Sequence, residues 1–326
     1  MILILTNKGD IHPNPVIEKL TEKGVKVFRF NTECLLSDYI VSWECKNNKT
    51  DFILKNKITQ AEIKGSEIKS VWERRPEKPN QSDIENEQIK KICLDEAKGF
   101  LIALQYYLKD KFWIGNAIYD SVASSKLLQL KTAIDIGMKV PDTIHTNNKQ
   151  QLDDFLNSQN QVVIKSLETQ SFDIDEQNHI VFWTRKHYKT EILNYPENAV
   201  NSTVNFIQEY IEKKFELRIT VVCDKVFACK IESQHLEDDK GKTDFRQGYE
   251  GIKYSAYELP KNVSNSCIEY LKLMNLNFGC FDFIVSPNDE YIFLECNPNG
   301  QWLWIEQETG LKIADTIANY LIKGNS

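Results

Sequence analysis

Two stretches in the last third of the chain decide its fold: Gly-Cys-Phe-Asp-Phe-Ile-Val at residues 279–285 and Phe-Leu-Glu-Cys-Asn-Pro-Asn-Gly at residues 293–300. Each contains an apolar, aromatic-rich run, which favours a buried β-strand. The turn-forming residues between them predict a hairpin. Such a hairpin places Asp282 near Glu295 and Asn297, and the two-residue repeat of a strand puts Glu295 and Asn297 on one face.

The three polar side chains of this hairpin suit a metal ion. Carboxylate and amide oxygens are the hard ligands that Mg²⁺ prefers when it bridges nucleotide phosphates. The alternative is an edge hairpin whose charged residues simply face water, which is favoured for each residue taken singly. Together, and followed directly by Pro298 and Gly300, they predict a site for Mg²⁺ and ATP with Asp282, Glu295 and Asn297 as ligands.

The composition of the chain excludes several classes of function. The 326 residues carry a formal net charge of -7 at pH 7, which argues against non-specific nucleic-acid binding. No stretch approaches the roughly 20 apolar residues of a membrane span, and the N-terminus lacks the apolar core of a signal peptide. The eight cysteines form no CxxC pair. We therefore expect a cytoplasmic protein with reduced thiols, no membrane contact and no nucleic-acid partner.

The upstream sequence alternates predicted strands with predicted helices, which is typical of an α/β fold. A strand at 2–6, a helix ending at Gly24 and a strand at 25–30 predict the start of an open sheet. A long helix is expected at about 83–109, with Asp83 as its N-cap. Further strands are predicted at 39–43, 51–54 and 68–72.

We divide the chain into a first domain at 1–115, a second at 116–205 and a third at 206–326. In the second domain we expect one helix at 121–136 and a strand at 162–165 that pairs with 179–184. The loop between those strands contains no glycine and is expected to close as a lid over a substrate. The third domain has predicted strands at 207–211, 217–222 and 226–231, helices at 263–274 and 312–322, and the hairpin described above.

Together these features resemble the ATP-grasp superfamily over most of the chain, and the Asp282…Glu295-Cys-Asn297 pattern looks like its magnesium motif. The resemblance implies an ATP-grasp fold behind an open α/β pre-ATP-grasp domain, with ATP and Mg²⁺ as cofactors. The nucleotide contacts that it implies follow in order: Lys126 on the first helix of the ATP-binding part, Lys165 at the end of Val-Val-Ile-Lys, the adenine hinge Glu209, Tyr210 and Ile211, Glu216 near the ribose, and Lys230 in a later strand.

Three further stretches narrow the resemblance. Val-Trp-Glu-Arg-Arg-Pro at 71–76 and Asn-Pro-Asn-Gly-Gln-Trp-Leu-Trp-Ile-Glu at 297–306 look like microviridin-type ligases, which mature ribosomally made peptides called graspetides. Thr-Asp-Phe-Arg at 243–246 resembles that family and also the ribosomal-protein glutamate ligases. The narrower resemblance implies ω-ester or ω-amide bonds from Asp or Glu to Ser, Thr or Lys side chains of one precursor peptide, which comprises a leader and a core. It also implies a homodimer.

The implied reaction has two steps. A substrate carboxylate attacks the γ-phosphate of ATP, and a hydroxyl or amine then attacks the acyl phosphate. We expect Arg218 to oppose phosphate charge and Arg246 to receive the substrate carboxylate, because a guanidinium can bind it bidentately. Asp244 is expected to orient Arg246 or to help deprotonate the nucleophile. The alternative for Asp244 and Arg246 is a plain surface ion pair.

Two other functions remain open. One is an intermolecular ligase that adds an amino acid to a peptide or protein C-terminus, and the other is an ATP-binding regulator without turnover. The complete set of Asp282, Glu295 and Asn297 argues against the regulator. Trp302 and Trp304 in the C-terminal stretch favour the intramolecular ligase over the intermolecular one.

Overall fold

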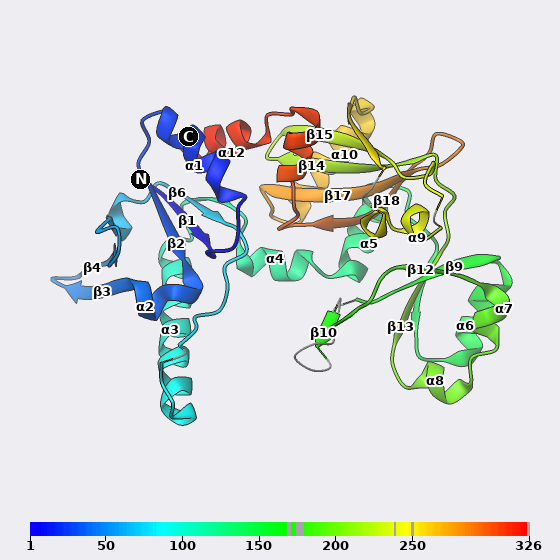
Figure 1. Cartoon of the computed structure of the whole chain (residues 1–326), viewed down its shortest axis with the longest axis horizontal. Coiled ribbons are helices and arrows are strands. Elements are labelled where there is room, and N and C mark those ends of the chain that lie inside the picture. The colour runs from blue at the N-terminus through cyan, green and yellow to red at the C-terminus, as the bar shows by residue number, and fades with distance from the viewer. Residues whose placement is uncertain (82, 168–170, 174–178, 238, 249–250, 325–326) are drawn as a thin grey trace.

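The computed structural model describes residues 1–326 except 82, 168–170, 174–178, 238, 249–250 and 325–326. The N-terminal part is built on a parallel sheet in the order β2–β1–β6–β7 (Figure 1). Its strands are β1 (Ile2–Thr6), β2 (Val27–Asn31), β6 (Ser70–Glu73) and β7 (Phe112–Ile114). All five side chains of β1 are buried, which is typical of a strand covered on both faces. This open sheet confirms the predicted start of the fold.

Helices and a smaller sheet cover this parallel sheet. The antiparallel strands β3 (Tyr39–Lys46), β4 (Lys49–Asn56) and β5 (Glu62–Lys64) form the smaller sheet. Helix α1 (Pro13–Glu22) follows β1, the short helix α2 (Leu35–Asp38) precedes β3, and α3 (Glu87–Tyr107) precedes β7. Leu3 and Leu5 of β1 belong to the core on the α3 side, whereas Ile2 and Ile4 belong to the core on the α1 side.

Helix α3 differs from its prediction at its N-terminal end. Asn86, and not Asp83, caps it: the Asn86 side chain accepts hydrogen bonds from the backbone N–H groups of Gln88 and Ile89. The helix projects beyond the sheet (Figure 1), so Ile89 and Ile92 are exposed although they share a helical spacing with other apolar residues of α3. The apolar pattern therefore continues past the surface that the domain itself covers.

The middle part of the chain begins with two helices, α4 (Ala117–Ala123) and α5 (Lys126–Asp135), where one was predicted. Ser125 breaks them apart because its backbone is extended. A four-stranded sheet follows in the order β12–β9–β13–β8. Its strands are β8 (Thr143–Thr146), β9 (Gln161–Lys165), β12 (Arg185–Tyr188) and β13 (Asn205–Glu209), with α6 (Lys149–Asn157), α7 (Lys189–Leu193) and α8 (Glu197–Asn201) alongside.

The prediction that residues 179–184 pair with β9 was wrong. β12 pairs with β9, and β11 (His179–Val181) pairs with β10 (Ser171–Asp173) in a separate two-stranded sheet. The segment after β9 thus forms its own hairpin before the chain returns to the sheet. Most of the glycine-free loop predicted as a lid, residues 168–170 and 174–178, lies outside the described residues.

The C-terminal part is a five-stranded antiparallel sheet in the order β16–β15–β14–β17–β18. Its strands are β14 (Phe215–Val222), β15 (Lys225–Glu232), β16 (Lys253–Tyr257), β17 (Phe278–Val285) and β18 (Tyr291–Asn297). The helices are α9 (Asp239–Thr243), α10 (Lys261–Leu273), α11 (Leu303–Thr309) and α12 (Ile313–Lys323).

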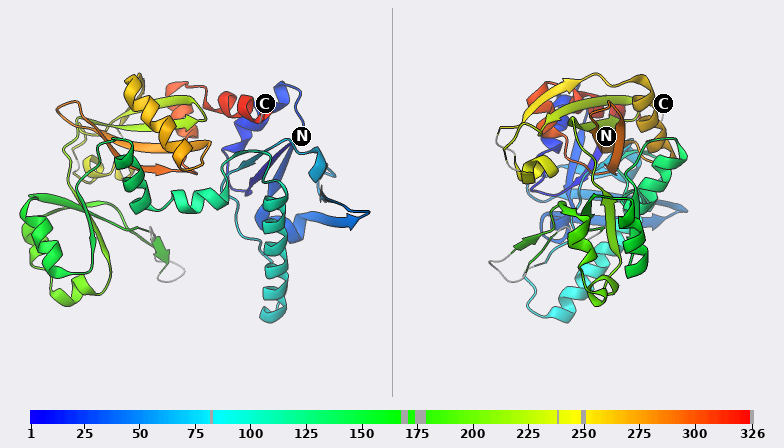
Figure 2. Two further views of the ribbon diagram at one scale, coloured as in Figure 1. Left: turned by 180° about the vertical axis from the view of Figure 1, so that it is seen from behind. Right: turned by 90° about the vertical axis from the view of Figure 1, so that its right-hand side faces the viewer.

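The last helix returns to the N-terminal part. Figure 2 shows α12 beside α1, with the two chain ends close together. One apolar core joins Ile4 of β1 and Leu20 of α1 to Cys280 of β17 and Ile317 of α12. The N-terminal and C-terminal parts are therefore packed on each other through a continuous core.

All eight cysteines are free. No helix within the described residues combines the length and apolar character needed to cross a bilayer.

Candidate active site

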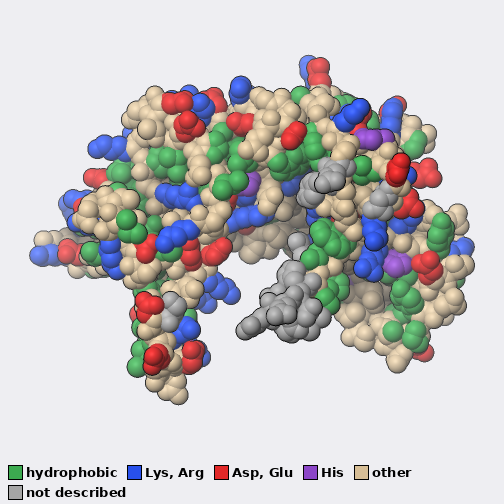
Figure 3. Space-filling model, in the orientation of Figure 1, with side chains coloured by type: hydrophobic (Ala, Val, Ile, Leu, Met, Phe, Trp, Pro, Cys, Tyr) green, Lys and Arg blue, Asp and Glu red, His purple; other side chains and the backbone are tan. Residues whose placement is uncertain are grey.

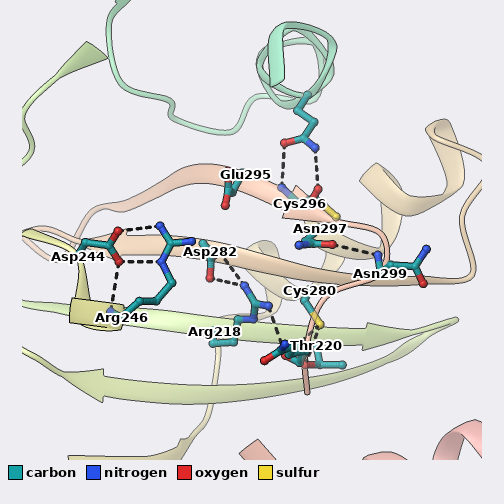
Figure 4. A network of polar contacts seen from close by, with 12 residues as sticks. Arg218, Thr220, Asp244, Arg246, Cys280, Asp282, Glu295, Cys296, Asn297 and Asn299 are labelled. Atoms are coloured by element: carbon teal, nitrogen blue, oxygen red, sulfur yellow. Dashed lines mark hydrogen bonds and ion pairs between the residues drawn. The ribbon is translucent and has the colours of Figure 1, made fainter. Parts of the chain in front are cut away.

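The predicted hairpin of β17 and β18 is present, and it brings the three candidate metal ligands together. Asp282 and Glu295 are direct partners in the ladder, and Asn297 stands opposite Cys280. A bulge follows between Asp282 and Phe283. Because partners in an antiparallel ladder share a face, the two carboxylates and the amide lie on one side of the sheet, as Figure 4 shows.

The chemistry of these side chains fits a magnesium ion. Among the described residues, no group of three His, Cys, Asp or Glu side chains is placed to hold a metal ion, and the candidate set here consists of two carboxylates and the Asn297 amide. Oxygen donors of this kind suit Mg²⁺.

Asp282 is paired with a cation from the neighbouring strand. The Arg218 Nη1 atom on β14 lies 2.8 and 2.7 Å from the two carboxylate oxygens of Asp282. The Arg218 Nη2 atom also donates to the Gln301 carbonyl at 3.3 Å. Arg218 therefore lies beside the candidate metal ligand Asp282.

Two lysines approach Glu295 from other elements. Lys126, the first residue of α5, places its Nζ atom 3.8 Å from Glu295 Oε2 and donates to the Leu167 carbonyl at 3.3 Å. Lys165 ends β9, and burial lowers the pKa of its ammonium group. Burial alone would raise the pKa of Glu295, but Lys126, Lys165 and two arginines lower it below its usual value. The site is therefore electropositive around its carboxylates, as an anionic phosphate chain requires.

Arg246 and Asp244 form a closed pair between α9 and β16. The Arg246 Nε and Nη2 atoms donate to the two Asp244 oxygens at 2.8 and 2.7 Å (Figure 4). Asp244 is buried, whereas the Arg246 side chain is 46% exposed and lies 5.9 Å from the Trp183 ring. Burial of the carboxylate argues against a plain surface ion pair. Asp244 holds the edge of the guanidinium that carries Nε and Nη2.

The hinge residues line a cavity. Glu209, Tyr210 and Ile211 follow β13 and border a cavity of about 510 Å³ together with the turn between β17 and β18. Its size lies within the range of small-molecule sites.

Figure 3 shows the molecule hollowed between α3 and the middle sheet, with Lys and Arg side chains above the hollow.

Glu216 is buried near the hinge with both oxygens engaged. Lys213 Nζ contacts Glu216 Oε1 at 2.7 Å, and Ser233 Oγ donates to Oε2 at 2.6 Å. Burial raises the pKa of Glu216 although Lys213 opposes this. Lys213 was not predicted as a site residue.

The structure separates Lys230 from the other candidates, contrary to its prediction as a nucleotide contact. Lys230 is the ladder partner of Leu217 on β14, and Leu217 belongs to the core on the opposite face from Arg218. Lys230 is paired with Glu232 and lies over the Phe215 ring at 4.7 Å. The physical reason is register: the side chain next to Arg218 on β15 is Cys229.

A residue that was not predicted from the sequence supports β18, the strand that carries Glu295 and Asn297. Gln129 of α5 is buried; its Nε2 donates to the Cys296 carbonyl at 2.7 Å, and its Oε1 accepts from the Cys296 N–H at 3.1 Å. Since β18 is an edge strand, this amide satisfies backbone groups between Glu295 and Asn297. A glutamine beside Leu130 and Ala133 on the buried face of α5 is the one feature that could have indicated it.

Two family models match the chain. Residues 1–120 match the MvdD pre-ATP grasp domain, and residues 120–321 match the RimK-like ATP-grasp domain. A comparison with curated proteins found no match.

Solved structures match nearly the whole chain. A RiPP-associated ATP-grasp ligase of Chryseobacterium gregarium, in complex with ADP and a leader and core peptide, is 28% identical, with a TM-score of 0.89 and coverage of 99% of this chain and 96% of that one. The macrocyclase MdnC of Microcystis aeruginosa MRC, bound with precursor peptide MdnA, is 26% identical, with a TM-score of 0.82 and coverage of 99% of both chains. MdnB of that organism, also a macrocyclase, is 26% identical, with a TM-score of 0.77 and coverage of 98% of both chains.

Proposed function

Since the chain belongs to the ATP-grasp family, with a pre-ATP-grasp domain ahead of its RimK-like domain, we propose that it is an ADP-forming ligase that crosslinks side chains of one ribosomally made precursor peptide. The bonds are ω-esters or ω-amides from Asp or Glu to Ser, Thr or Lys. Similarity over nearly the full chain to a ligase solved with ADP and a leader and core peptide, and to a macrocyclase bound with its precursor peptide, supports this. The observation that carries the proposal is the convergence of Asp282, Glu295 and Asn297 with cations from three separate elements.

ATP binds between the middle and C-terminal sheets in this proposal. The backbone of Glu209, Tyr210 and Ile211 receives adenine, and Glu216 lies near the ribose. Lys126 and Lys165 contact the phosphates. These assignments are supported by the hinge cavity and by the position of both lysines beside Glu295.

Asp282, Glu295 and Asn297 would hold Mg²⁺, which would neutralise phosphate charge. Arg218 is fixed by Asp282 and stabilises the charge that develops as the γ-phosphoryl group is transferred.

Arg246 receives the substrate carboxylate and places it in line with that phosphoryl group. The carboxylate oxygen bonds to phosphorus and ADP leaves; the hydroxyl or amine of the second side chain then bonds to the acyl carbon, loses its proton and expels phosphate. The protein mainly positions the groups and stabilises charge. Asp244 orients Arg246, and its burial against the guanidinium supports that role.

Trapping of the acyl phosphate tests this route. With ATP, Mg²⁺ and a precursor peptide, added hydroxylamine should convert activated side chains to hydroxamates and should yield ADP. The reaction should require both ATP and peptide. Hydroxamate formed together with AMP would indicate an adenylate and would contradict the proposal.

We also propose that the protein is a homodimer in the cytoplasm. Ile92, Ile102 and Tyr106 are 62%, 56% and 64% exposed on one side of α3, and an apolar helix face of this kind suits a second copy. Eight free cysteines suit a reducing compartment. Light scattering of the wild type and of Ile102→Lys tests the dimer: a monomeric variant supports it, and a monomeric wild type contradicts it. We propose a division near residue 115 and, because β13 (Asn205–Glu209) belongs to the middle sheet, a second division after residue 209 and not at 205.

A further inference from the structure

The turn after β18 contacts the candidate metal site directly. Asn299 lies two residues beyond Asn297, and its backbone N–H donates to the Asn297 side-chain oxygen at 3.1 Å (Figure 4). That oxygen is the atom proposed to face the metal. The position of Asn299 therefore sets the orientation of the Asn297 amide.

Residues of the N-terminal part and of helix α4 also form hydrogen bonds with Asn299. Its carbonyl oxygen accepts hydrogen bonds from Arg74 Nη1 and, at 3.2 Å, from Arg75 Nε, both in the segment that leaves β6. Its side-chain amide donates to Asp120 Oδ2 on α4. One residue thus joins the N-terminal sheet, the helix α4 and the strand β18.

The segment that holds Asn299 is itself firmly anchored. Arg74 is 1% exposed, and its Nε atom lies 3.2 Å from Asp10 Oδ2. Asp10 in turn contacts His12 Nδ1 at 2.8 Å. Arg75 has a left-handed backbone with φ of 46°, which is uncommon for a residue other than glycine, and its carbonyl accepts from Asn7 Nδ2 at 2.7 Å. This arrangement leaves the Asn299 carbonyl little freedom to move.

The turn has no room to adjust on its inner side either. A Cβ atom on Gly300 would lie 2.3 Å from the Cys280 Cβ atom and 3.0 Å from Arg218 Nη2. The next residue, Gln301, accepts from Arg218 through its carbonyl. Because the turn is pressed against β17, a shift of Asn299 must change the position of Asn297.

We propose that Asn299 is a positioning residue through which the N-terminal part orients the Asn297 amide toward Mg²⁺. This inference rests on the proposed function, because it takes Asn297 as a ligand. Residues that orient metal ligands commonly affect metal affinity although they never touch the ion. The pre-ATP-grasp domain would thereby contribute to the metal site indirectly, through Asn299, in addition to any contact with the peptide.

The Mg²⁺-dependent gain in ADP affinity tests this role without relying on turnover. ADP dissociation constants are measured with Mg²⁺ and with EDTA. Asn299→Ala keeps the backbone N–H but loses the bond to Asp120. The Mg²⁺-dependent gain in ADP affinity should therefore fall about tenfold, which is the lower end of the effects seen for residues that orient metal ligands. Affinity in EDTA should stay unchanged. Asp120→Ala, and the double variant, should show the same loss, since all three variants lose the bond between Asn299 and Asp120.

Two controls separate positioning from general damage. Asp120→Asn keeps an acceptor oxygen and should retain most of the gain. Asn319→Ala removes a similar bond, from Asn319 Nδ2 to Asp315 Oδ2 at 2.9 Å on α12, and should leave the gain unchanged.

Three results would overturn the inference: a wild-type gain in Asn299→Ala, an equal loss of ADP affinity with and without Mg²⁺, or a double variant clearly worse than either single one. If the wild type shows no Mg²⁺-dependent gain at all, the metal role in the proposed function fails with it. If Glu295→Ala loses the gain while Asn299→Ala keeps it, only this inference fails.

Discussion

The Nη1 atom of Arg218 contacts both carboxylate oxygens of Asp282, at 2.8 and 2.7 Å, across the neighbouring strands β14 and β17. The pair fixes a guanidinium beside the candidate metal ligands before any nucleotide binds. A charge that is already in place need not reorganise when phosphate charge develops. Removing either partner would leave the other charge unpaired in a largely buried place. Variants at this pair would therefore change fold stability as well as nucleotide binding, and the two effects could not be separated. Glu295, whose ion pair with Lys126 is longer at 3.8 Å, is the better probe of the metal site.

We expect Glu295→Ala to lose ATP turnover by at least about a hundredfold, the scale of a lost electrostatic contact in an active site. The fold should persist, because the Glu295 side chain is 30% exposed. ADP release and circular dichroism measure the two effects. Glu232→Ala, a carboxylate on the far face of the same sheet, serves as the control. A Glu295→Ala variant with normal turnover would remove the magnesium assignment.

Lys165 and Lys230 offer a matched pair of charge deletions. Lys165→Met should weaken ATP binding at least about tenfold, as expected for loss of a charged contact. Lys230→Met should leave ATP affinity unchanged, because Lys230 lies on the opposite face with Phe215. Calorimetric titration with ADP and a non-hydrolysable ATP analogue measures both. Equal losses in the two variants would contradict the placement of the nucleotide.

Arg246 should act on the peptide and not on the nucleotide. Arg246→Lys keeps the charge but loses the two-pronged geometry, so peptide processing should fall sharply. Nucleotide affinity should change little. Mass spectrometry and nucleotide titration measure the two quantities side by side. A large loss of ATP affinity would instead identify Arg246 as a phosphate ligand.

A buried carboxyl pair predicts a pH effect on stability. Burial, and then Asp120, raises the pKa of Glu73 from its ordinary 4.5 to about 7. A raised carboxyl pKa means that the folded state binds the proton more tightly. The stabilisation that proton binding at Glu73 gives to the folded state is therefore complete below about pH 4.5 and is lost as the pH rises to about 7. The loss amounts to about 3 kcal/mol of unfolding free energy.

Glu73→Gln should remove this dependence, since Gln105 can still donate to the amide oxygen at that position. The thermal unfolding midpoint should drop between pH 5 and pH 8, and this drop should be several degrees larger in the wild type than in Glu73→Gln. Parallel slopes for the two proteins would show that Glu73 does not titrate in this range.

Local patterns predicted the strands and the metal hairpin because strand alternation is a short-range property. The pairing of Asp282 with Glu295 needed only a tight turn between two apolar runs. The two faces of a sheet are harder to predict. Whether Lys230 lies beside Arg218 depends on the register between β14 and β15, which spacing within one strand does not contain.

Other features depend on contacts between distant segments. Gln129 reaches Cys296, and Asn299 reaches Asp120 and Arg74; a local pattern can mark Gln129 as a polar residue on a buried face, but it does not identify the partner in any of these pairs. The break at Ser125 separates two helices whose apolar spacing is nearly continuous. Exposure of Ile92 on α3 follows from the projection of that helix beyond the sheet, which periodicity does not describe.

The mass of the peptide product tests the central claim most directly. The purified protein, ATP, Mg²⁺ and its precursor peptide should give a product lighter by one water for each ring. The reason is that joining a carboxylate to a hydroxyl or amine within one molecule removes water and adds no atoms. One ADP should form per ring, because each carboxylate is activated once. A product heavier by an amino-acid residue would show an intermolecular ligase, and an unchanged peptide with an intact leader would contradict the account.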